Sequence, residues 1–255
     1  METRQFYDDL APYYDLIFEN WDASMSRQGA VLEHLIQSEL GAEGSGAPPR
    51  ILDAACGIGT QALPLALRGF RVTARDLSPG AIARLRREAE VREVVIDADV
   101  ADMRFVAANV SGPFDVVLAF DNSIPHLTSD SDISVALREF RKILRPGGLC
   151  LLSVRDYDTV PRGVTTMHPY GEHRRGNEVF RLRQEWTWEG SMHYQIAFIV
   201  EKLGSNGPET LMRTVTRYYA LSIQRLLELM TGVGFTGCRR LDETIYQPIV
   251  IGHVV

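Results

Sequence analysis

Apolar and polar residues alternate along this chain with two different periods. Between residues 50 and 155, short apolar runs typical of buried strands alternate with segments in which apolar residues recur at helical spacing. The expected strands lie at 51–55, 71–74, 94–96, 115–120 and 149–154, and the expected helices at 61–68, 79–89 and 130–144. This alternation predicts an α/β fold with a doubly wound, parallel sheet.

The pattern changes after Arg155. A loop rich in proline, glycine and histidine over 156–178 precedes three runs in which apolar residues alternate with period two, at 179–188, 193–202 and 211–221. Hairpin signals join these runs, so they predict an antiparallel meander. Such a meander cannot belong to the parallel sheet itself, and we expect it to form a cap or an extension of the sheet edge.

The N-terminal segment is dense in aromatic residues. Six of them lie within the first 21 residues, namely Phe6, Tyr7, Tyr13, Tyr14, Phe18 and Trp21. They predict either a helix that packs on the core or a lid that closes over a ligand. A second helix is expected over 24–40, followed by a short flexible connection over 41–50.

These patterns divide the chain into three parts. We expect an N-terminal helical lid over 1–49, an inserted antiparallel cap over 156–220, and a core formed by 50–155 and 221–255. The C-terminal part of the core should contain a helix over 222–230 and a final strand over 248–255.

Composition narrows the class of protein. The chain has 255 residues, of which 45% are hydrophobic and 24% charged, with a formal net charge of −6. This composition excludes intrinsic disorder, and the acidic balance argues against a nucleic-acid partner held by phosphate contacts. No apolar run reaches the roughly 18–20 residues of a membrane span, and the first residues lack the apolar region of a secretory signal. The three cysteines are widely spaced, so we expect a reduced, cytoplasmic protein without disulfides or a zinc site.

The strongest local signal is the segment 51–61, IleLeuAspAlaAlaCysGlyIleGlyThrGln. Gly57 and Gly59 lie where a strand turns into a helix, and glycine there lets a ligand approach the backbone. The spacing also fits a dinucleotide-binding dehydrogenase. However, a carboxylate at Asp53 would repel a pyrophosphate and favour a ligand with a positive charge. The structural alternative for Asp53 is a cap of the following turn.

Further acids follow the next two strands. Asp76 ends the second strand, where a carboxylate can accept hydrogen bonds from both hydroxyls of a ribose. Helix capping is the alternative for Asp76, but Ser78 is better placed for it. Asp99 follows the third strand, where a side chain would face an adenine edge, although Asp97 and Asp102 compete for that role.

These motifs resemble those of the class I S-adenosylmethionine-dependent methyltransferases. The similar segments occur in the family's order: AspAlaAlaCysGlyIleGly (53–59), AspLeuSerPro (76–79), AlaAspVal (98–100), GlyProPheAspValValLeuAlaPhe (112–120) and LeuArgProGlyGly (144–148). A narrower resemblance, to the glycine and glycine/sarcosine N-methyltransferases, rests on AspAsnSerIleProHisLeu (121–127), ValArgAspTyrAsp (154–158) and ArgTyrTyrAla (217–220). The chain departs from the animal glycine enzymes at Asp121, where glycine is usual.

The resemblance implies a Rossmann-like, mostly parallel seven-stranded sheet with an inserted antiparallel cap. It also implies S-adenosyl-L-methionine as cofactor and S-adenosyl-L-homocysteine as product. Together with the acids and glycines above, the implied cofactor residues are Tyr7, Tyr14, Trp21, Arg27, Asp53, Ala55, Gly57, Gly59, Asp76, Leu77, Asp99, Val100 and Phe120. The residues implied for the methyl acceptor are Asn122, His126, Arg155 and one of Tyr218 and Tyr219, which alternate across a strand.

Two acceptor residues have structural alternatives. Arg155 suits a bidentate clamp for a carboxylate, but it could instead pair with Asp156 or Asp158. His126 either helps to remove a proton from the amine or caps the following helix.

The favoured function is an N-methyltransferase that acts on glycine, sarcosine or another small amino acid, mainly by positioning the reactants and excluding water. One alternative keeps the cofactor but methylates a secondary-metabolite amine, a heterocycle or a carboxylate. Another is a non-catalytic module that binds the cofactor. His168, His173 and His193 lack ligand spacing, so no metal is expected. The expected partner is a small amine with a carboxylate, without nucleic acid or membrane, and the chain is expected to be a monomer or a homo-oligomer.

Overall fold

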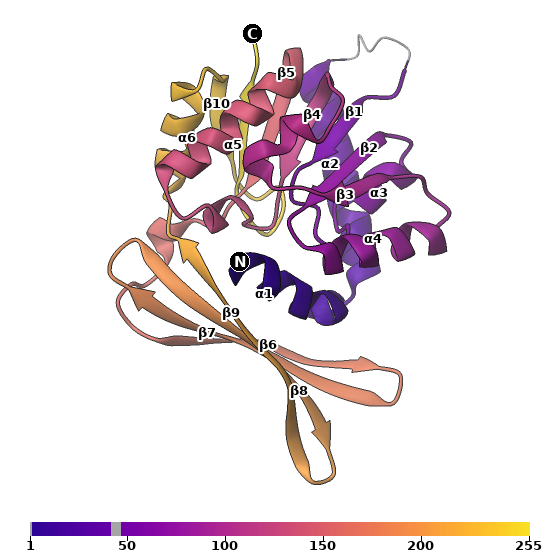
Figure 1. The fold of residues 1–255 in the computed structure, drawn as a ribbon, viewed down its shortest axis with the longest axis vertical. Coiled ribbons are helices and arrows are strands. Elements are labelled where there is room, and N and C mark those ends of the chain that lie inside the picture. The colour runs from indigo at the N-terminus through magenta and orange to yellow at the C-terminus, as the bar shows by residue number, and fades with distance from the viewer. Residues whose placement is uncertain (1, 42–46) are drawn as a thin grey trace.

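The computed structural model of the protein describes residues 2–41 and 47–255. Seven strands form one sheet in the order β10–β11–β5–β4–β1–β2–β3 (Figure 1). Most of the connection expected over 41–50 lies outside these residues. Strands β1 to β5 run parallel, whereas β11 is antiparallel to both of its neighbours. The strands are β1 (Arg50–Asp53), β2 (Arg71–Asp76), β3 (Asp97–Val100), β4 (Phe114–Ala119), β5 (Leu144–Ser153), β10 (Thr236–Leu241) and β11 (Ile249–His253).

Helices cover both faces of this sheet, because successive strand residues point to opposite sides. Ile51 packs into the apolar cluster under α2, α3 and α4, and its neighbour Leu52 packs into the cluster under α5 and α6. The helices are α2 (Trp21–Leu40), α3 (Ala62–Leu67), α4 (Pro79–Val91), α5 (Asp130–Ile143) and α6 (Ile223–Gly232). In the described part of the chain, no helix combines the length and apolar character needed to cross a bilayer.

Serine side chains fix where three of these helices begin. Ser78, Ser129 and Ser222 each accept a hydrogen bond from the backbone N–H three residues further on, at 3.0–3.1 Å. Such caps satisfy one of the free N–H groups of the first turn and typically contribute about 1 kcal/mol. The cap at Ser78 leaves the carboxylate of Asp76 available for other contacts.

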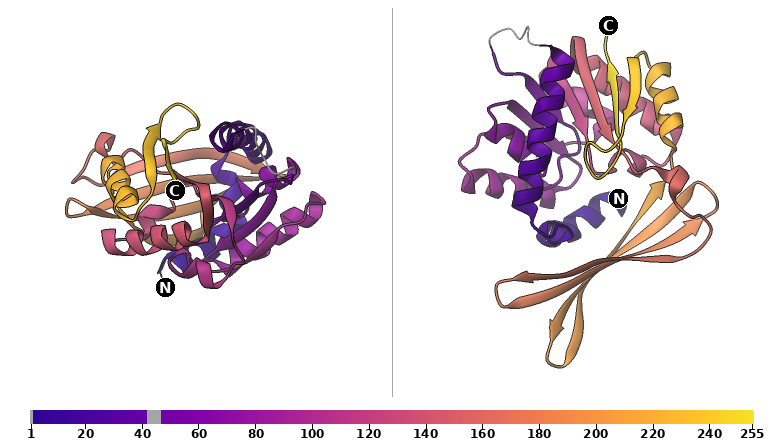
Figure 2. Two further views of the ribbon diagram at one scale, coloured as in Figure 1. Left: turned by 90° about the horizontal axis from the view of Figure 1, so that it is seen from above. Right: turned by 180° about the vertical axis from the view of Figure 1, so that it is seen from behind.

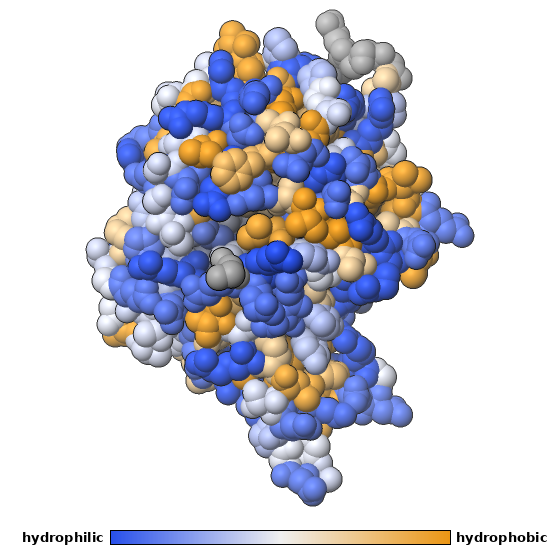
Figure 3. All heavy atoms as spheres, in the orientation of Figure 1, coloured by the Kyte–Doolittle hydropathy of each residue, from blue (hydrophilic) through white to orange (hydrophobic). Residues whose placement is uncertain are grey.

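A second sheet, inserted between β5 and α6, forms the cap. Its four antiparallel strands are β6 (Thr166–Arg175), β7 (Glu178–Glu189), β8 (His193–Gly204) and β9 (Gly207–Tyr219). The cap sheet projects below the core in Figure 1. The face of the molecule drawn in Figure 3 is mostly hydrophilic, with scattered apolar side chains. The predicted fold class, a doubly wound sheet with an antiparallel cap, is confirmed.

The N-terminal helix α1 (Glu2–Leu10) lies between the core and the cap sheet (Figures 1 and 2). Oδ1 of Asp8 accepts hydrogen bonds from the hydroxyl of Ser78 at 2.6 Å and from the backbone N–H of Gly80 at 2.8 Å. On the other side, Asp9 accepts one from the hydroxyl of Thr214 on β9 at 3.0 Å. A single 3₁₀ segment, η1 (Ala11–Ile17), then leads into α2.

Several strands differ from the sequence prediction, and three of them differ most. β3 lies at 97–100 rather than 94–96, and Val95 in the predicted run is 92% exposed. β6 occupies part of the predicted loop 156–178, and its register shifts between Pro169 and Gly171. β10 was not predicted because its residues are mostly polar and exposed at the sheet edge.

Candidate active site

Two adjoining cavities lie at the carboxyl ends of the parallel strands. The first, which we call the β1–β2 cavity, has a volume of about 200 Å³ and is lined by the loop after β1 and the ends of β2 and β4. The second, the cap cavity, has a volume of about 740 Å³ and lies between the N-terminal segment, the end of β5 and the cap sheet. Tyr7, Tyr14 and Asp121 line both cavities and therefore mark their junction. Open α/β sheets bind ligands at this edge.

More than half of the predicted cofactor residues line the β1–β2 cavity. They are Tyr7, Tyr14, Ala55, Gly57, Asp76, Leu77 and Phe120. The other predicted cofactor residues do not line this cavity. Contacts within the protein account for the positions of several of them without a ligand.

Asp76 presents a carboxylate to the β1–β2 cavity from the end of β2. Its Oδ2 accepts a hydrogen bond from the backbone N–H of Gly57 at 2.8 Å, and its Oδ1 accepts one from the backbone N–H of Ser78 at 2.8 Å. Burial raises the pKa of Asp76, and these backbone donors oppose that shift. A carboxylate has about four acceptor positions. The positions left over suit two neighbouring hydroxyl groups of a sugar.

The two glycines of the loop after β1 have different surroundings. Gly57 has a φ of +52°, and a Cβ placed there would meet nothing within 4 Å, so its backbone opens onto the cavity that it lines. Gly59 has a φ of +101°, and a Cβ there would collide with the side chains of Leu63 and Leu85. Gly57 therefore leaves room for a ligand, whereas Gly59 is required by the packing of the loop against α3 and α4.

Asp53 is fully buried at the end of β1. One of its carboxyl oxygens has no hydrogen-bond partner among the described residues, and the other accepts only a long bond, of 3.4 Å, from the backbone N–H of Ala55. Burial raises the pKa of Asp53 to about 8. The expected negative charge is therefore largely absent at pH 7 in the protein alone. A positively charged ligand nearby would lower that pKa and restore the charge.

The N-terminal segment and α2 together bring three of the predicted residues to the cavities, namely Tyr7, Tyr14 and Arg27. Burial raises the pKa of Tyr7 and of Tyr14 well above the ordinary value, so both hydroxyl groups remain neutral. Arg27, on α2, lines the cap cavity and forms no ion pair with any residue that the structure describes. A free guanidinium at this place can pair with an anionic group of a ligand.

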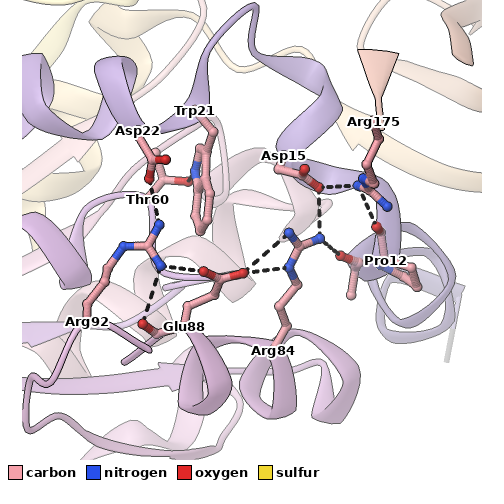
Figure 4. A network of polar contacts seen from close by, with 10 residues as sticks. Pro12, Asp15, Trp21, Asp22, Thr60, Arg84, Glu88, Arg92 and Arg175 are labelled. Carbon is pink, nitrogen blue, oxygen red and sulfur yellow. Dashed lines mark hydrogen bonds and ion pairs between the residues drawn. The ribbon is translucent and has the colours of Figure 1, made fainter. Parts of the chain in front are cut away.

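Trp21 is held in a polar network rather than at a cavity. Its Nε1 donates a hydrogen bond to the hydroxyl of Thr60 at 3.1 Å, and the guanidinium groups of Arg84 and Arg92 lie 5.7 and 5.3 Å from its ring (Figure 4). Glu88 bonds to both arginines. Trp21 is not among the described residues that line either cavity. It therefore secures α2 against α4, which indirectly fixes the N-terminal segment.

The acid after β3 that lines the β1–β2 cavity is Asp102 rather than Asp99. Asp99 is exposed and pairs with Arg86 at 3.4 Å, and Val100 is 39% exposed. Neither is among the described residues that line this cavity. Burial opposes ionisation of Asp102, but hydrogen bonds from Arg104 lower its pKa. Of the three acids named for this role, Asp97, Asp99 and Asp102, only Asp102 is among the described residues that line the cavity.

Arg155 follows β5 and presents its guanidinium to the cap cavity. Its Nη1 donates a hydrogen bond to the hydroxyl of Tyr194 at 3.2 Å, and its Cζ lies 4.4 Å from the ring centroid of Trp186. These contacts hold the side chain against the cap sheet without neutralising its charge. An unneutralised, largely buried guanidinium favours the binding of an anion.

The acids next to Arg155 in the sequence are paired elsewhere. Asp156 contacts Arg240 at 2.8 Å, and Asp158 contacts Arg162 at 3.8 Å. Arg155 itself forms no ion pair within the described residues. The structural alternative, a local pair with one of these acids, is therefore wrong.

Asn122 is buried, and its amide is engaged with the protein. Its Oδ1 accepts a hydrogen bond from the backbone N–H of Arg155 at 2.9 Å, and its Nδ2 donates one to the hydroxyl of Tyr157 at 2.7 Å. The hydroxyl of Tyr157 in turn lies 2.8 Å from that of Tyr194. Asn122 thus orders the groups that hold Arg155.

His126 contacts two of the tyrosines. Its Nε2 lies 2.7 Å from the hydroxyl of Tyr7, and its ring centroid lies 4.0 Å from that of Tyr218. Burial lowers the pKa of His126 to about 3, so the ring is neutral and a weak base at physiological pH. Tyr218 lines the cap cavity, whereas the hydroxyl of Tyr219 donates to Asp130 at 2.9 Å on the other side of the strand. Of the two tyrosines, Tyr218 is the inward one.

Asp121 is a residue of the site that sequence reasoning did not assign. The sequence signal for Asp121 was that an aspartate stands where the animal glycine enzymes usually have glycine. Across 2–41 and 47–255, no group of three or more histidine, cysteine, aspartate and glutamate side chains is arranged to hold a metal ion.

Known proteins are similar to this chain in sequence. Residues 51–148 match the family described as a methyltransferase domain. The glycine/sarcosine N-methyltransferase of Parasynechococcus marenigrum (strain WH8102) is 31% identical over 160 residues, which cover 63% of this chain and 54% of that protein. The chain therefore contains a region, 51–148, that is similar to a methyltransferase domain. The glycine/sarcosine N-methyltransferase of Halorhodospira halochloris is 29% identical over 169 residues, covering 66% of this chain and 60% of that protein.

Solved structures share the fold of this chain. The S-adenosylmethionine-bound amino pentose methyltransferase of Micromonospora echinaspora has a TM-score of 0.76 and 16% identity, covering 96% of this chain and 95% of that one. The chain spans just over half the length of the curated glycine/sarcosine relatives that it matches.

Proposed function

We propose that this protein is a methyltransferase that transfers a methyl group from S-adenosylmethionine to the nitrogen of a small amine that also carries a carboxylate, such as glycine or sarcosine. Arg155 carries the proposal, because its guanidinium faces the cap cavity with no anionic partner among the described residues. A guanidinium matches a carboxylate with two parallel hydrogen bonds. The similarity to glycine/sarcosine N-methyltransferases supports the same class of acceptor.

The residues of the β1–β2 cavity fit S-adenosylmethionine, which when bound supplies a methyl group on a positively charged sulfur. Asp76 would accept hydrogen bonds from the ribose hydroxyls, and the open backbone at Gly57 leaves space for the nucleoside. Tyr7 and Tyr14 would cover the junction with the cap cavity. Arg27 would pair with the carboxylate of the methionine part.

The acceptor residues act mainly by positioning. Arg155 would hold the carboxylate and thereby aim the amine nitrogen at the junction of the two cavities. The neutral hydroxyl groups of Tyr7 and Tyr218, which lie 3.4 Å apart, offer oxygen acceptors to the amine. His126, with a pKa of about 3, would orient Tyr7 rather than remove a proton. The ammonium group of the acceptor would lose one proton to solvent before the transfer, so that the nitrogen lone pair can form the bond to the methyl group as the bond from methyl to sulfur breaks. The aromatic walls exclude water from the reacting groups.

A methyl-transfer assay tests the proposal. Radiolabelled S-adenosylmethionine would be offered with glycine, sarcosine and other amino acids, and with matched amines that lack a carboxylate. We expect turnover of an amino acid, and Arg155→Met should raise its KM on the order of 100-fold, since a charge-assisted bond contributes about 1.5–3 kcal/mol. Arg181→Met, at an exposed pair with Glu172, is the control. Turnover of carboxylate-free amines alone, unaffected by Arg155→Met, would contradict the proposal.

A second candidate acceptor is a larger amine such as an amino sugar. The cap cavity, about 740 Å³, exceeds what glycine requires, and the fold is shared with an amino pentose methyltransferase. An amino sugar has no carboxylate for Arg155, so its turnover would be insensitive to Arg155→Met. Tight cofactor binding without turnover of any acceptor would instead indicate a binding module.

A further inference from the structure

Asp121 is a partly buried acid at the junction of the β1–β2 cavity and the cap cavity. We propose that its carboxylate binds the ammonium group of the methyl acceptor, so that the site recognises a zwitterion with its carboxylate on Arg155 and its ammonium on Asp121. The inference rests on the proposed function, since it assigns the second half of the same acceptor site.

The backbone at Asp121 favours glycine. Asp121 has a φ of +56° and Asn122 a φ of +63°, in the left-handed region that most side chains avoid. The turn is fixed by Ser153 of β5, whose hydroxyl accepts from the N–H of Asp121 at 2.8 Å and whose carbonyl accepts from the N–H of Asn122 at 3.1 Å. An aspartate where glycine would be less strained points to a use for its carboxylate.

The carboxylate is held from two sides. The hydroxyl of Tyr246, in the loop before β11, donates to Oδ1, and Nε2 of Gln61, after β1, donates to Oδ2 at 3.2 Å. Gln61 is itself fixed, because the same nitrogen donates to Gln28 at 2.9 Å. Two of about four acceptor positions therefore remain, and Asp121 forms no ion pair within the described part of the chain. A pre-oriented carboxylate of this kind suits an ammonium ion.

Two side chains of opposite charge line the cap cavity without pairing with each other. Asp121 and Arg155 line this cavity but do not pair within 4 Å, while the neighbouring acid Asp156 is neutralised by Arg240. Both charged groups influence the hydroxyl of Tyr170. Burial raises the pKa of Tyr170, Arg155 lowers it and Asp121 raises it. A zwitterion would neutralise both charges at once. A neutral amino sugar would leave Arg155 without a partner.

Two variants remove the carboxylate without disturbing the turn. Asp121→Asn keeps the shape, and asparagine tolerates a positive φ; Asp121→Gly removes the side chain and relieves the backbone. Glycine and acetate would be titrated calorimetrically into each protein saturated with S-adenosylhomocysteine. We expect wild type to bind glycine more tightly than acetate, and both variants to lose about tenfold or more of that preference. Glu19→Gln, an acid that lines the same cavity, is the control.

The outcomes separate the inference from the function. If wild type methylates glycine or sarcosine and both variants keep the KM and the preference for glycine over acetate, the assignment of Asp121 is wrong while the proposed function stands. If the variants weaken S-adenosylmethionine binding and leave the acceptor unaffected, Asp121 binds the ammonium of the cofactor instead, and the inference fails. If wild type neither binds nor methylates any amino acid, the proposed function itself fails, and the zwitterion site fails with it.

Discussion

The hydroxyl of Tyr7 lies 2.7 Å from Nε2 of His126, and this contact joins the first helix to the turn after β4 where the two cavities meet. The two residues are 119 positions apart in the chain. The contact forms only because α1 is docked between the core and the cap, through Asp8 on one side and Asp9 on the other. The N-terminal segment is therefore an integral wall of the site.

Replacing His126 by phenylalanine should lower kcat by about tenfold or more, because the hydroxyl of Tyr7 loses the partner that orients it. The shape of the pH–rate profile should not change between pH 6 and 9, since a pKa of about 3 keeps His126 neutral throughout. Tyr7→Phe should give a similar loss, and the double variant should be no worse than either single one. Disappearance of a limb near pH 6.5 in His126→Phe would show instead that the imidazole titrates during catalysis.

The glycines after β1 offer a matched pair of variants. Gly59→Ala should lower the free energy of unfolding by more than about 2 kcal/mol, because the new methyl group collides with Leu63 and Leu85. Gly57→Ala should cost only about 1–2 kcal/mol, from its positive φ, yet weaken cofactor binding, because the methyl group enters the cavity. Chemical denaturation and calorimetric titration measure the two effects. Equal losses of stability would contradict the division of roles.

The sequence pattern predicted most of the core but not the partners of individual side chains. Strand and helix periods depend on local burial, so β1, β2, β4 and the capped helices could be read directly. β6 was missed because its residues are largely polar and exposed on a sheet edge, and proline and glycine interrupt it at a register shift. Trp21 was expected at the cofactor, but its placement depends on Arg84 and Arg92, more than 60 residues away, which no local pattern reveals.

The two acids of β2 and β3 should differ sharply in cofactor binding. Asp76→Ala should raise the Kd of S-adenosylmethionine and of S-adenosylhomocysteine on the order of 30- to 100-fold, since it removes the acceptor that faces the cavity and the partner of the Gly57 N–H. Asp99→Ala should change either Kd less than twofold, because Asp99 is exposed and pairs with Arg86. Titration calorimetry distinguishes them. An equally strong effect at Asp99 would place the cofactor differently from the proposal.

Asp53 should make the fold less stable as the pH rises. The pKa of Asp53 is about 8 in the folded protein, whereas the ordinary value of 3.8 applies to the unfolded chain. Between pH 4 and 8 the native chain therefore holds a proton that the unfolded chain has lost. The free energy of unfolding then falls with increasing pH in this window, by on the order of 1 kcal/mol per pH unit. Asp53→Asn, which resembles the neutral acid, should remove that dependence and become increasingly more stable than wild type from pH 5 to pH 8.

Denaturant unfolding at several pH values measures this difference, with Asp99→Asn as the control for the loss of one exposed carboxylate. The same residue should also respond to the cofactor. Because a bound sulfonium cation favours the ionised form of Asp53, the preference of wild type for S-adenosylmethionine over neutral S-adenosylhomocysteine should strengthen as the pH rises toward 8. In Asp53→Asn this preference should not depend on pH. A pH-independent preference in wild type, together with an unchanged stability slope in the variant, would show that Asp53 is ionised in the folded protein.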